Sequence, residues 1–258
     1  MNIESSDFIA PGSDTITQWS RETQYFLLTR LQVGGRLLLR KSLKPQYLLD
    51  DHLRETLRKE YEIGSIVGMN SDYIVNYYQM VDTSEECYLT MDFVEGATLS
   101  ELVVEEPQYF SHESNVIRFL LQLLDGLQSI HRNQVVHLDL KPSNIMLTRV
   151  SHDVRIIDLG FCYSDAYQTS MGMTDAFAAP EQKDGDSTLK VDTRTDIYGF
   201  GRLLEEINND LAKAKNKTLP TKYVSLMKQC LEKDPKKRPQ HASDCERFLR
   251  RGGVLRIT

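Results

Sequence analysis

Apolar positions in the part of the chain up to Val94 follow a strand-like pattern. Two apolar-rich runs, Tyr25–Val33 and Arg36–Leu43, are separated by Gly34-Gly35. A Gly-Gly pair between two such runs favours a β-hairpin. The runs Tyr73–Val81 and Cys87–Val94 have the same character, so this region is expected to consist mainly of β-strands.

One segment of this region has helical periodicity instead. Apolar side chains recur four residues apart within Asp50–Val67, at Leu53, Leu57 and Tyr61. That spacing places them on one face of a helix. Either Asp50 or Asp51 can cap its first turn.

The pattern becomes mainly helical after Val94. A stripe of apolar positions indicates a helix with Ser111 as its expected N-cap, and its members are Val116, Leu120, Leu123, Leu124, Leu127 and Ile130. Short strand signals surround Asn144–Leu147 and Val154–Ile157, and the chain is helical again from Asp196. The polar, lysine-rich stretch between Ile207 and Pro220 is expected to be a short loop.

These elements indicate an α+β protein in which a small β-rich lobe with one helix precedes a larger helical lobe. The expected division is a loose tail over residues 1–14, the small lobe over residues 15–94 and the larger lobe over residues 95–258.

Composition and charge narrow the function classes. The net charge of 31 − 37 = −6 argues against a nucleic-acid-binding protein. None of the four cysteines forms a CxxC pair, so reduced thiols are expected rather than zinc or disulfides. No apolar run approaches the length that spans a bilayer, and the first fourteen residues do not resemble a signal peptide. A cytoplasmic protein without a membrane partner is expected.

Two polar segments of the larger lobe carry the candidate chemistry. The first runs His137-Leu138-Asp139-Leu140-Lys141-Pro142-Ser143-Asn144, and the second is Asp158-Leu159-Gly160. Phosphoryl transfer needs a group that orients a hydroxyl, cations that neutralise charge and oxygen ligands for Mg²⁺. Asp139 can orient the hydroxyl, Lys141 can reach the transferring phosphate, and Asn144 and Asp158 offer hard oxygen ligands.

The order H-x-D-x-K-x-x-N followed by D-x-G resembles the catalytic and metal loops of protein kinases. The resemblance implies a bilobal protein-kinase-like fold with ATP and Mg²⁺ as cofactors. It also implies that Asp139 is the catalytic base and that Asn144 and Asp158 are metal ligands. Lys141 stands two residues after the aspartate, as in Ser/Thr kinases.

Further segments resemble the family. Ala179-Pro180-Glu181 matches the A-P-E that closes the activation segment, and Thr174 matches the threonine of the substrate platform in Ser/Thr kinases. The run from Asp196 to Gly201 resembles the start of the large buried helix. The resemblance implies that Arg238 pairs with Glu181.

The nucleotide-binding residues are also assigned by resemblance. Lys41 fits the lysine of V-A-I-K, and counting back from Ile74 gives Glu62 as its helix partner, with Glu60 as the alternative. Met91 would be the gatekeeper, and the backbone of Asp92 and Val94 would meet the adenine edge. Thr98 could face the ribose, and Met146 would lie under the adenine ring.

The chain departs from the family at three places. The segment Trp19–Gln24, where the phosphate-covering loop should lie, contains no glycine. Leu39 replaces the small residue above the adenine. Leu138 replaces the arginine that receives an activation-loop phosphate, so activity is expected not to require phosphorylation of that loop.

The expected function is therefore ATP-dependent transfer of phosphate to Ser/Thr hydroxyls of protein substrates. The alternatives are a weakly active or inactive kinase-like scaffold and a small-molecule phosphotransferase. The protein substrates and the oligomeric state are not identified by the sequence.

Overall fold

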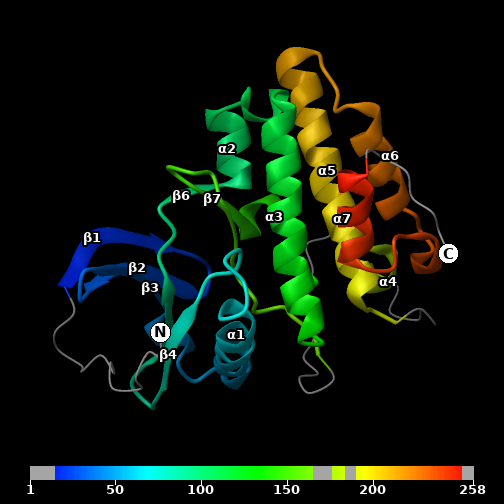
Figure 1. Ribbon diagram of the computed structural model, residues 1–258. Coiled ribbons are helices and arrows are strands. Elements are labelled where there is room, and N and C mark those ends of the chain that lie inside the picture. Colours follow the sequence, from blue (N-terminus) through cyan, green and yellow to red (C-terminus); the bar gives the residue numbers. More distant parts are fainter. Residues whose placement is uncertain (1–14, 165–175, 184–189, 252–258) are drawn as a thin grey trace. The chain divides into compact units, whose positions relative to one another are not determined.

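The computed structural model describes residues 15–164, 176–183 and 190–251 (Figure 1). The chain divides into two compact units. One unit comprises the described chain up to Tyr61 together with Asn76–Phe93, and the other comprises Glu62–Val75 and the chain from Val94 onward. The expected lobe boundary at residue 94 lies beside this division, whereas the inclusion of Glu62–Val75 in the second unit was not predicted.

The first unit contains a five-stranded antiparallel sheet with the strand order β1-β2-β3-β5-β4. Its strands are β1 Thr15–Glu22, β2 Phe26–Val33, β3 Arg36–Leu43, β4 Tyr77–Asp82 and β5 Cys87–Asp92. Gly34 and Gly35 connect β2 to β3 with φ angles of 53° and 82°, which glycine adopts without steric cost. The hairpin expected from the sequence is confirmed.

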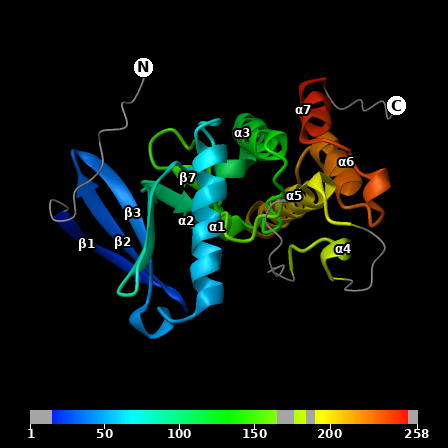
Figure 2. The ribbon, with the colours of Figure 1, turned by 90° about the horizontal axis from the view of Figure 1, so that it is seen from below.

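Helix α1 spans Asp51–Gly68, and its first part lies alongside the sheet (Figure 2). Asp50 caps the helix, because its Oδ1 accepts a hydrogen bond of 3.0 Å from the backbone N–H of Leu53. Arg54 and Arg58 both pair with Asp82 at the end of β4. These ion pairs and the fully buried Leu57 fix the first part of α1 to the sheet.

The second unit is mainly helical. Helix α3 packs against α7, and α5 packs against α6 (Figure 1). The apolar stripe predicted for α3 is buried, as are Phe200, Leu203 and Leu204 on α5. The helices are α2 Leu99–Glu105, α3 Glu113–Arg132, α4 Pro180–Lys183, α5 Thr193–Lys215, α6 Thr221–Cys230 and α7 Ala242–Arg250. The structure thus has the predicted β-rich N-terminal region and helical C-terminal region.

A small antiparallel sheet in the second unit holds the loops that carry the candidate chemistry. It consists of β6 Gly96–Thr98, β7 Ile145–Thr148 and β8 Val154–Ile156 in that order. The 3₁₀ turn Pro142–Asn144 leads directly into β7. Asp158 follows β8 by two residues. The pairing of β7 with β8 therefore restricts the positions of Asn144, just before β7, and Asp158, just after β8.

Two local expectations are wrong. Helix α3 begins after His112, because Ser111 belongs to the preceding 3₁₀ turn Tyr109–Ser111, and the Ser111 hydroxyl has no hydrogen-bond partner among the described residues. Helix α5 continues to Lys215 instead of ending near Ile207. Buried Leu211 extends its apolar face, and an αL residue, Asn216, ends it. Within the described residues, no helix has both the length and the apolarity needed to cross a bilayer.

Candidate active site

Three side chains of the predicted catalytic loop meet at one carboxylate. Lys141 Nζ lies 2.6 Å from Asp139 Oδ2, and Asn144 Nδ2 donates to the same oxygen at 2.9 Å. Asn144 Nδ2 also donates to the backbone oxygen of Asp139 at 3.0 Å. Asp139 is only 2% exposed. A lysine and an amide therefore hold the carboxylate in one orientation.

The backbone of this loop is fixed by a second buried carboxylate. Asp196, on the first turn of α5, accepts hydrogen bonds from the backbone N–H groups of His137 (2.8 Å) and Leu138 (2.9 Å). Its Oδ2 also lies 2.8 Å from His131 Nε2. Leu138 has a φ of 66°, a sparsely populated conformation for a leucine. The bonds to Asp196 stabilise that strained peptide.

His137, the first residue of the loop, is fully buried. Its Nδ1 accepts a hydrogen bond from the backbone N–H of Asp139 at 3.3 Å. Burial lowers the pKa of His137, and this effect outweighs the opposing influence of the carboxylates of Asp196, Asp139 and Asp158. The ring is therefore neutral near pH 7, and its Nδ1 supports the Asp139 peptide by accepting a hydrogen bond from the Asp139 N–H.

The predicted metal ligands provide suitable oxygen atoms. Both hydrogen bonds that Asn144 makes to Asp139 use its amide nitrogen, which leaves Oδ1 for a metal ion. Asp158 lies after β8 with a φ of 62°, and its Oδ1 accepts a long 3.5 Å bond from the N–H of Gly160. No group of three or more His, Cys, Asp or Glu residues that could hold a metal occurs in the described ranges. Mg²⁺ does not need one, since it binds through one or two protein oxygens together with phosphates and water.

In the first unit, the predicted phosphate-binding lysine has a buried partner. Lys41 Nζ lies 2.7 Å from Glu60 Oε2, and Tyr77 Oη donates to Glu60 Oε1 at 3.2 Å. The expectation that Glu62 would be the partner is therefore wrong. Two residues along a helix correspond to a rotation of about 200°, so Glu62 lies on another face of α1 than the one that meets β3.

The residues predicted to surround the adenine in the first unit share one face of the sheet. Leu39 is the cross-strand partner of Met91, and Lys41 follows Leu39 by two residues on the same strand. The Asp92 carboxylate accepts hydrogen bonds from the Asn76 backbone (2.9 Å) and from Tyr78 Oη (2.6 Å). The Asp92 N–H also donates to the Asn76 oxygen at 2.9 Å, so the predicted adenine contact of Asp92 would use its backbone carbonyl.

The remaining adenine and ribose candidates lie in the second unit. Thr98 and Met146 are cross-strand partners in β6 and β7. The Thr98 hydroxyl caps α2 by accepting a 3.2 Å bond from the N–H of Glu101, so it has a structural role. Gly96 permits this pairing, since a Cβ there would lie 2.0 Å from the Leu147 oxygen. The predicted contacts of Val94, Thr98 and Met146 with a nucleotide remain predictions.

The glycine-free turn between β1 and β2 is closed by its own hydrogen bonds. Thr23 N–H donates to the Phe26 oxygen at 2.9 Å, and Phe26 N–H donates to Thr23 Oγ1 at 3.0 Å. Glu22 Oε2 pairs with Lys44 Nζ at 2.9 Å. Lys44 therefore offsets the negative charge that would otherwise repel a phosphate near this turn.

The predicted pair at the end of the activation segment is confirmed. Arg238 donates to both carboxylate oxygens of Glu181, at 2.6 and 2.9 Å, and neither side chain has exposed surface. Thr195 Oγ1 donates to Glu181 Oε1 at 3.0 Å. These bonds anchor α4 to α5 and to the loop that precedes α7. Thr174, the predicted substrate-platform residue, lies outside the described residues.

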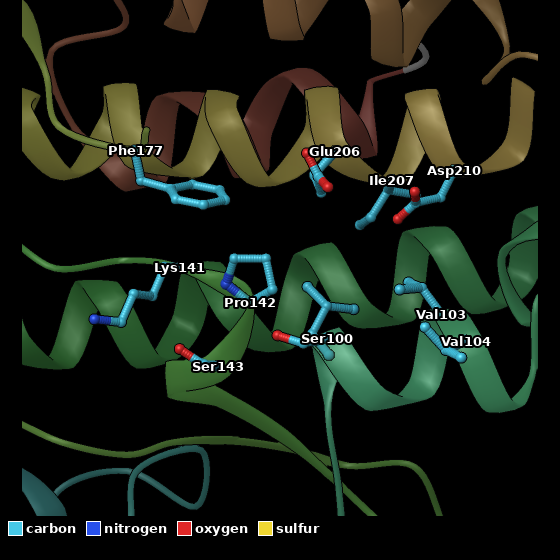
Figure 3. A pocket seen from close by; sticks show the side chains of 11 residues that line it. Ser100, Val103, Val104, Lys141, Pro142, Ser143, Phe177, Glu206, Ile207 and Asp210 are labelled. Atoms are coloured by element: carbon cyan, nitrogen blue, oxygen red, sulfur yellow. The ribbon is translucent and has the colours of Figure 1, made fainter. Parts of the chain in front are cut away.

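A pocket of about 440 Å³ in the second unit adjoins the catalytic loop (Figure 3). Glu206 and Asp210 of α5 line one wall, and Ser100 and Val103 of α2 line the opposite wall. Lys141, Pro142, Ser143 and Phe177 line the part of the pocket next to the loop. The pocket thus combines apolar surface with two carboxylates close to the predicted catalytic residues.

Two residues of the site were not assigned these roles from the sequence. The sequence indicates Asp196 only as the start of a helix, although a carboxylate directly before an apolar helical run is a signal for a buried anchoring role. Gln182 donates to the Leu138 oxygen and accepts from the Ala179 N–H, both at 2.9 Å. Nothing in the local sequence indicates this role, because the partner is 44 positions away.

Comparisons with known proteins agree with this geometry. The sequence matches the family model described as protein kinase domain over residues 36–210. A probable serine/threonine-protein kinase of Clostridium acetobutylicum is 27% identical over 231 residues, which cover 79% of this chain and 34% of that protein.

Two other relatives are similar over shorter stretches. The serine/threonine-protein kinase PknL of Mycobacterium tuberculosis is 33% identical over 156 residues, which cover 58% of this chain and 37% of that protein. Myosin light chain kinase 2 of Mus musculus is 32% identical over 145 residues, which cover 54% of this chain and 23% of that protein. The aligned parts thus span 23–37% of the length of these relatives. Because the family model covers more than half of the chain, which also has the bilobal α+β kinase fold, the chain belongs to the protein kinase domain family.

Proposed function

We propose that this chain transfers the γ-phosphate of ATP to Ser or Thr hydroxyls of protein substrates. The arrangement of Asp139, Lys141 and Asn144 carries the proposal. A buried carboxylate, held by a lysine at 2.6 Å and an amide at 2.9 Å, is suited to orient a hydroxyl and accept its proton. Phosphoryl transfer requires mainly such positioning and charge neutralisation.

The remaining residues fit supporting roles. Lys41, oriented by Glu60, would bind the α- and β-phosphates, and Lys141 would neutralise charge on the transferred group. Asn144 Oδ1 and Asp158 would hold Mg²⁺. When bound, Mg²⁺ would neutralise the charge that develops between the β- and γ-phosphates. Removal of Mg²⁺ by a chelator is therefore expected to abolish transfer.

A protein substrate is favoured by the second unit. Lys141 stands two positions after Asp139, which is the spacing that the resemblance to Ser/Thr kinases implies. The anchored A-P-E segment and the pocket beside Lys141 offer surface for a peptide. A small-molecule phosphotransferase would not need the A-P-E segment.

One observation supports a second candidate, a kinase-like scaffold with little activity. The turn after β1 is closed by bonds between Thr23 and Phe26 and contains no glycine whose backbone could approach a phosphate closely. Mg²⁺-dependent thermal stabilisation by ATP separates the two candidates. A ligand at 100 times its Kd adds about 2.7 kcal/mol to the free energy of unfolding, so no shift at millimolar ATP would favour the scaffold.

The direct test is transfer of labelled γ-phosphate by the wild type and by Asp139→Asn, with a generic Ser/Thr protein as acceptor. The substitution preserves the shape of the side chain but removes the base, and we expect a loss of about 10²–10⁴-fold. Phosphoamino-acid analysis of the product tests the Ser/Thr specificity. Equal labelling by both proteins would exclude Asp139 as the base, and no labelling by a folded wild type would refute the proposal.

A further inference from the structure

We propose that Gln182 is a positioning residue that connects the catalytic loop to the end of the activation segment without a phosphate. The inference rests on the proposed function, because it concerns how Asp139 is held for phosphoryl transfer. Gln182 touches no reacting atom, and it would act through the backbone of Leu138.

The side-chain amide of Gln182 forms a complete bridge. Its Nε2 donates to the Leu138 oxygen at 2.9 Å, and its Oε1 accepts from the Ala179 N–H at 2.9 Å. Gln182 is only 7% exposed, so both bonds are shielded from water. A buried amide whose donor and acceptor are both used is held in one orientation.

The carbonyl that Gln182 holds belongs to the peptide bond between Leu138 and Asp139. The N–H of Leu138 is bonded to Asp196 Oδ1 at 2.9 Å. Both backbone polar groups of Leu138 are therefore fixed, from opposite ends of the residue. Since Leu138 has a φ of 66°, the peptide that follows it depends on such restraints to keep its orientation. The orientation of this peptide in turn determines the orientation of the Asp139 side chain.

The bridge joins the loop to an element that is itself anchored. Gln182 follows Glu181, which is held by two hydrogen bonds from Arg238. No charged group takes part in the Gln182 bridge. Leu138 is 5% exposed and apolar, so it cannot receive a phosphate. The connection between the catalytic loop and the end of the activation segment through Gln182 is therefore made by neutral groups alone.

Two substitutions test the bridge. Gln182→Leu removes both hydrogen bonds, and Gln182→Glu at pH 8 places a negative charge against the Leu138 oxygen. We expect kcat to fall at least tenfold in both variants, since small displacements of a catalytic group are costly, while the KM for ATP stays within twofold. A protonated glutamic acid reproduces both bonds. The kcat of Gln182→Glu, taken relative to the wild type at the same pH, should therefore recover as the pH falls from 8 to 5.5, and that of Gln182→Leu should not.

The matched control is Gln128→Leu, which removes a part-buried amide that donates to Glu246 on α7. It should leave kcat within twofold. A wild-type kcat for Gln182→Leu, or an equal loss in the Gln128 variant, would overturn the proposal.

Hydrogen exchange of the Asp139 backbone amide separates this inference from the proposed function. The amide should exchange faster in Gln182→Leu than in the wild type, and at an unchanged rate in Gln128→Leu. This readout does not require transferase activity. Unchanged exchange in Gln182→Leu would refute the positioning role even if the protein is a kinase. If the wild type proves inactive but the Asp139 amide still exchanges faster in Gln182→Leu than in the wild type, the bridge is supported and only the proposed function is refuted.

Discussion

Lys41 and Glu60 form an ion pair of 2.7 Å in which the lysine side chain is 10% exposed and the glutamate side chain is 1% exposed. If Lys41 binds phosphates, Glu60 sets the position of its ammonium group. We predict that Glu60→Gln lowers kcat/KM for ATP at least tenfold, because the amide cannot hold the lysine by charge. Glu62→Gln, two residues along α1, is the matched control and should stay within twofold of the wild type. Steady-state kinetics at varied ATP concentration measure kcat/KM for both variants. Equal losses of kcat/KM in the two variants would contradict the assignment of Glu60 as the partner of Lys41.

The ion pair between Arg238 and Glu181 supplies a stability prediction. Both side chains are fully buried, so removal of one partner leaves an uncompensated charge. We predict that Arg238→Met lowers the free energy of unfolding by about 3–5 kcal/mol. Urea denaturation measures the change, and the double variant Glu181→Met/Arg238→Met should recover part of the loss. A loss below about 1 kcal/mol, or no recovery, would argue against a coupled pair.

A pH-dependent contribution to stability is expected at the start of α5. Asp192 caps the helix and bonds to Arg194. Burial acts to raise the pKa of Asp192, but the hydrogen bonds from Arg194 outweigh it and the pKa is lowered. A carboxylate with a lowered folded-state pKa stabilises the protein above its unfolded pKa of about 3.9, and the contribution is lost as the pH falls below that value.

The matched variant is Asp192→Asn, which keeps a capping side chain without the charge. Its stability deficit relative to the wild type should be constant between pH 7 and pH 5 and should shrink below about pH 4. Urea midpoints of both proteins across this range measure the deficit. A deficit that grows on acidification would contradict the direction of the shift.

Leu138 leads to a prediction about regulation. A buried leucine offers no cation to an activation-loop phosphate. Replacement of Thr169 and Ser170 by alanine should therefore leave the specific activity within about twofold of the wild type. Thr174 is kept, because its family counterpart has a structural role. Protein treated with a phosphatase provides the control, and loss of most activity in either case would contradict the prediction.

The pocket beside Lys141 suggests a substrate preference. Glu206 has no ion-pair partner among the described residues, and Asp210 pairs only with the exposed Lys213 at 3.7 Å. Apolar surface from Val103, Pro142 and Phe177 accompanies these carboxylates. Such a lining suits a side chain with an aliphatic stem and a cationic head.

We therefore predict that Glu206→Gln weakens the use of acceptor peptides with arginine near the target hydroxyl by about tenfold in kcat/KM. Peptides without a basic residue should be affected less than twofold. A peptide array assayed with both proteins measures the difference. An equal effect on both classes of peptide would show that the pocket does not bind the basic side chain selectively.

The sequence predicted the fold because its strongest signals are local. The catalytic motif and the apolar stripe of α3 each occupy a short stretch, and the structure contains both. The partner of Lys41 was missed because counting back from Ile74 fixes a position along α1 but not the face that meets the sheet. Gln182 could not be predicted, since its partner Leu138 is brought to it only by the folded chain.

Helix α5 contributes residues both to the catalytic loop's anchor and to the pocket. Asp196, which holds the catalytic loop, and Glu206, which lines the pocket, are ten residues apart on a helix that runs unbroken from Thr193 to Lys215. Ten residues correspond to about 15 Å of rise and a rotation of about 1,000°. An inserted residue between them would turn the pocket wall by about 100° relative to the loop. If Glu206 contacts a basic residue of a substrate, the spacing between that residue and the target hydroxyl would therefore depend on the geometry of α5.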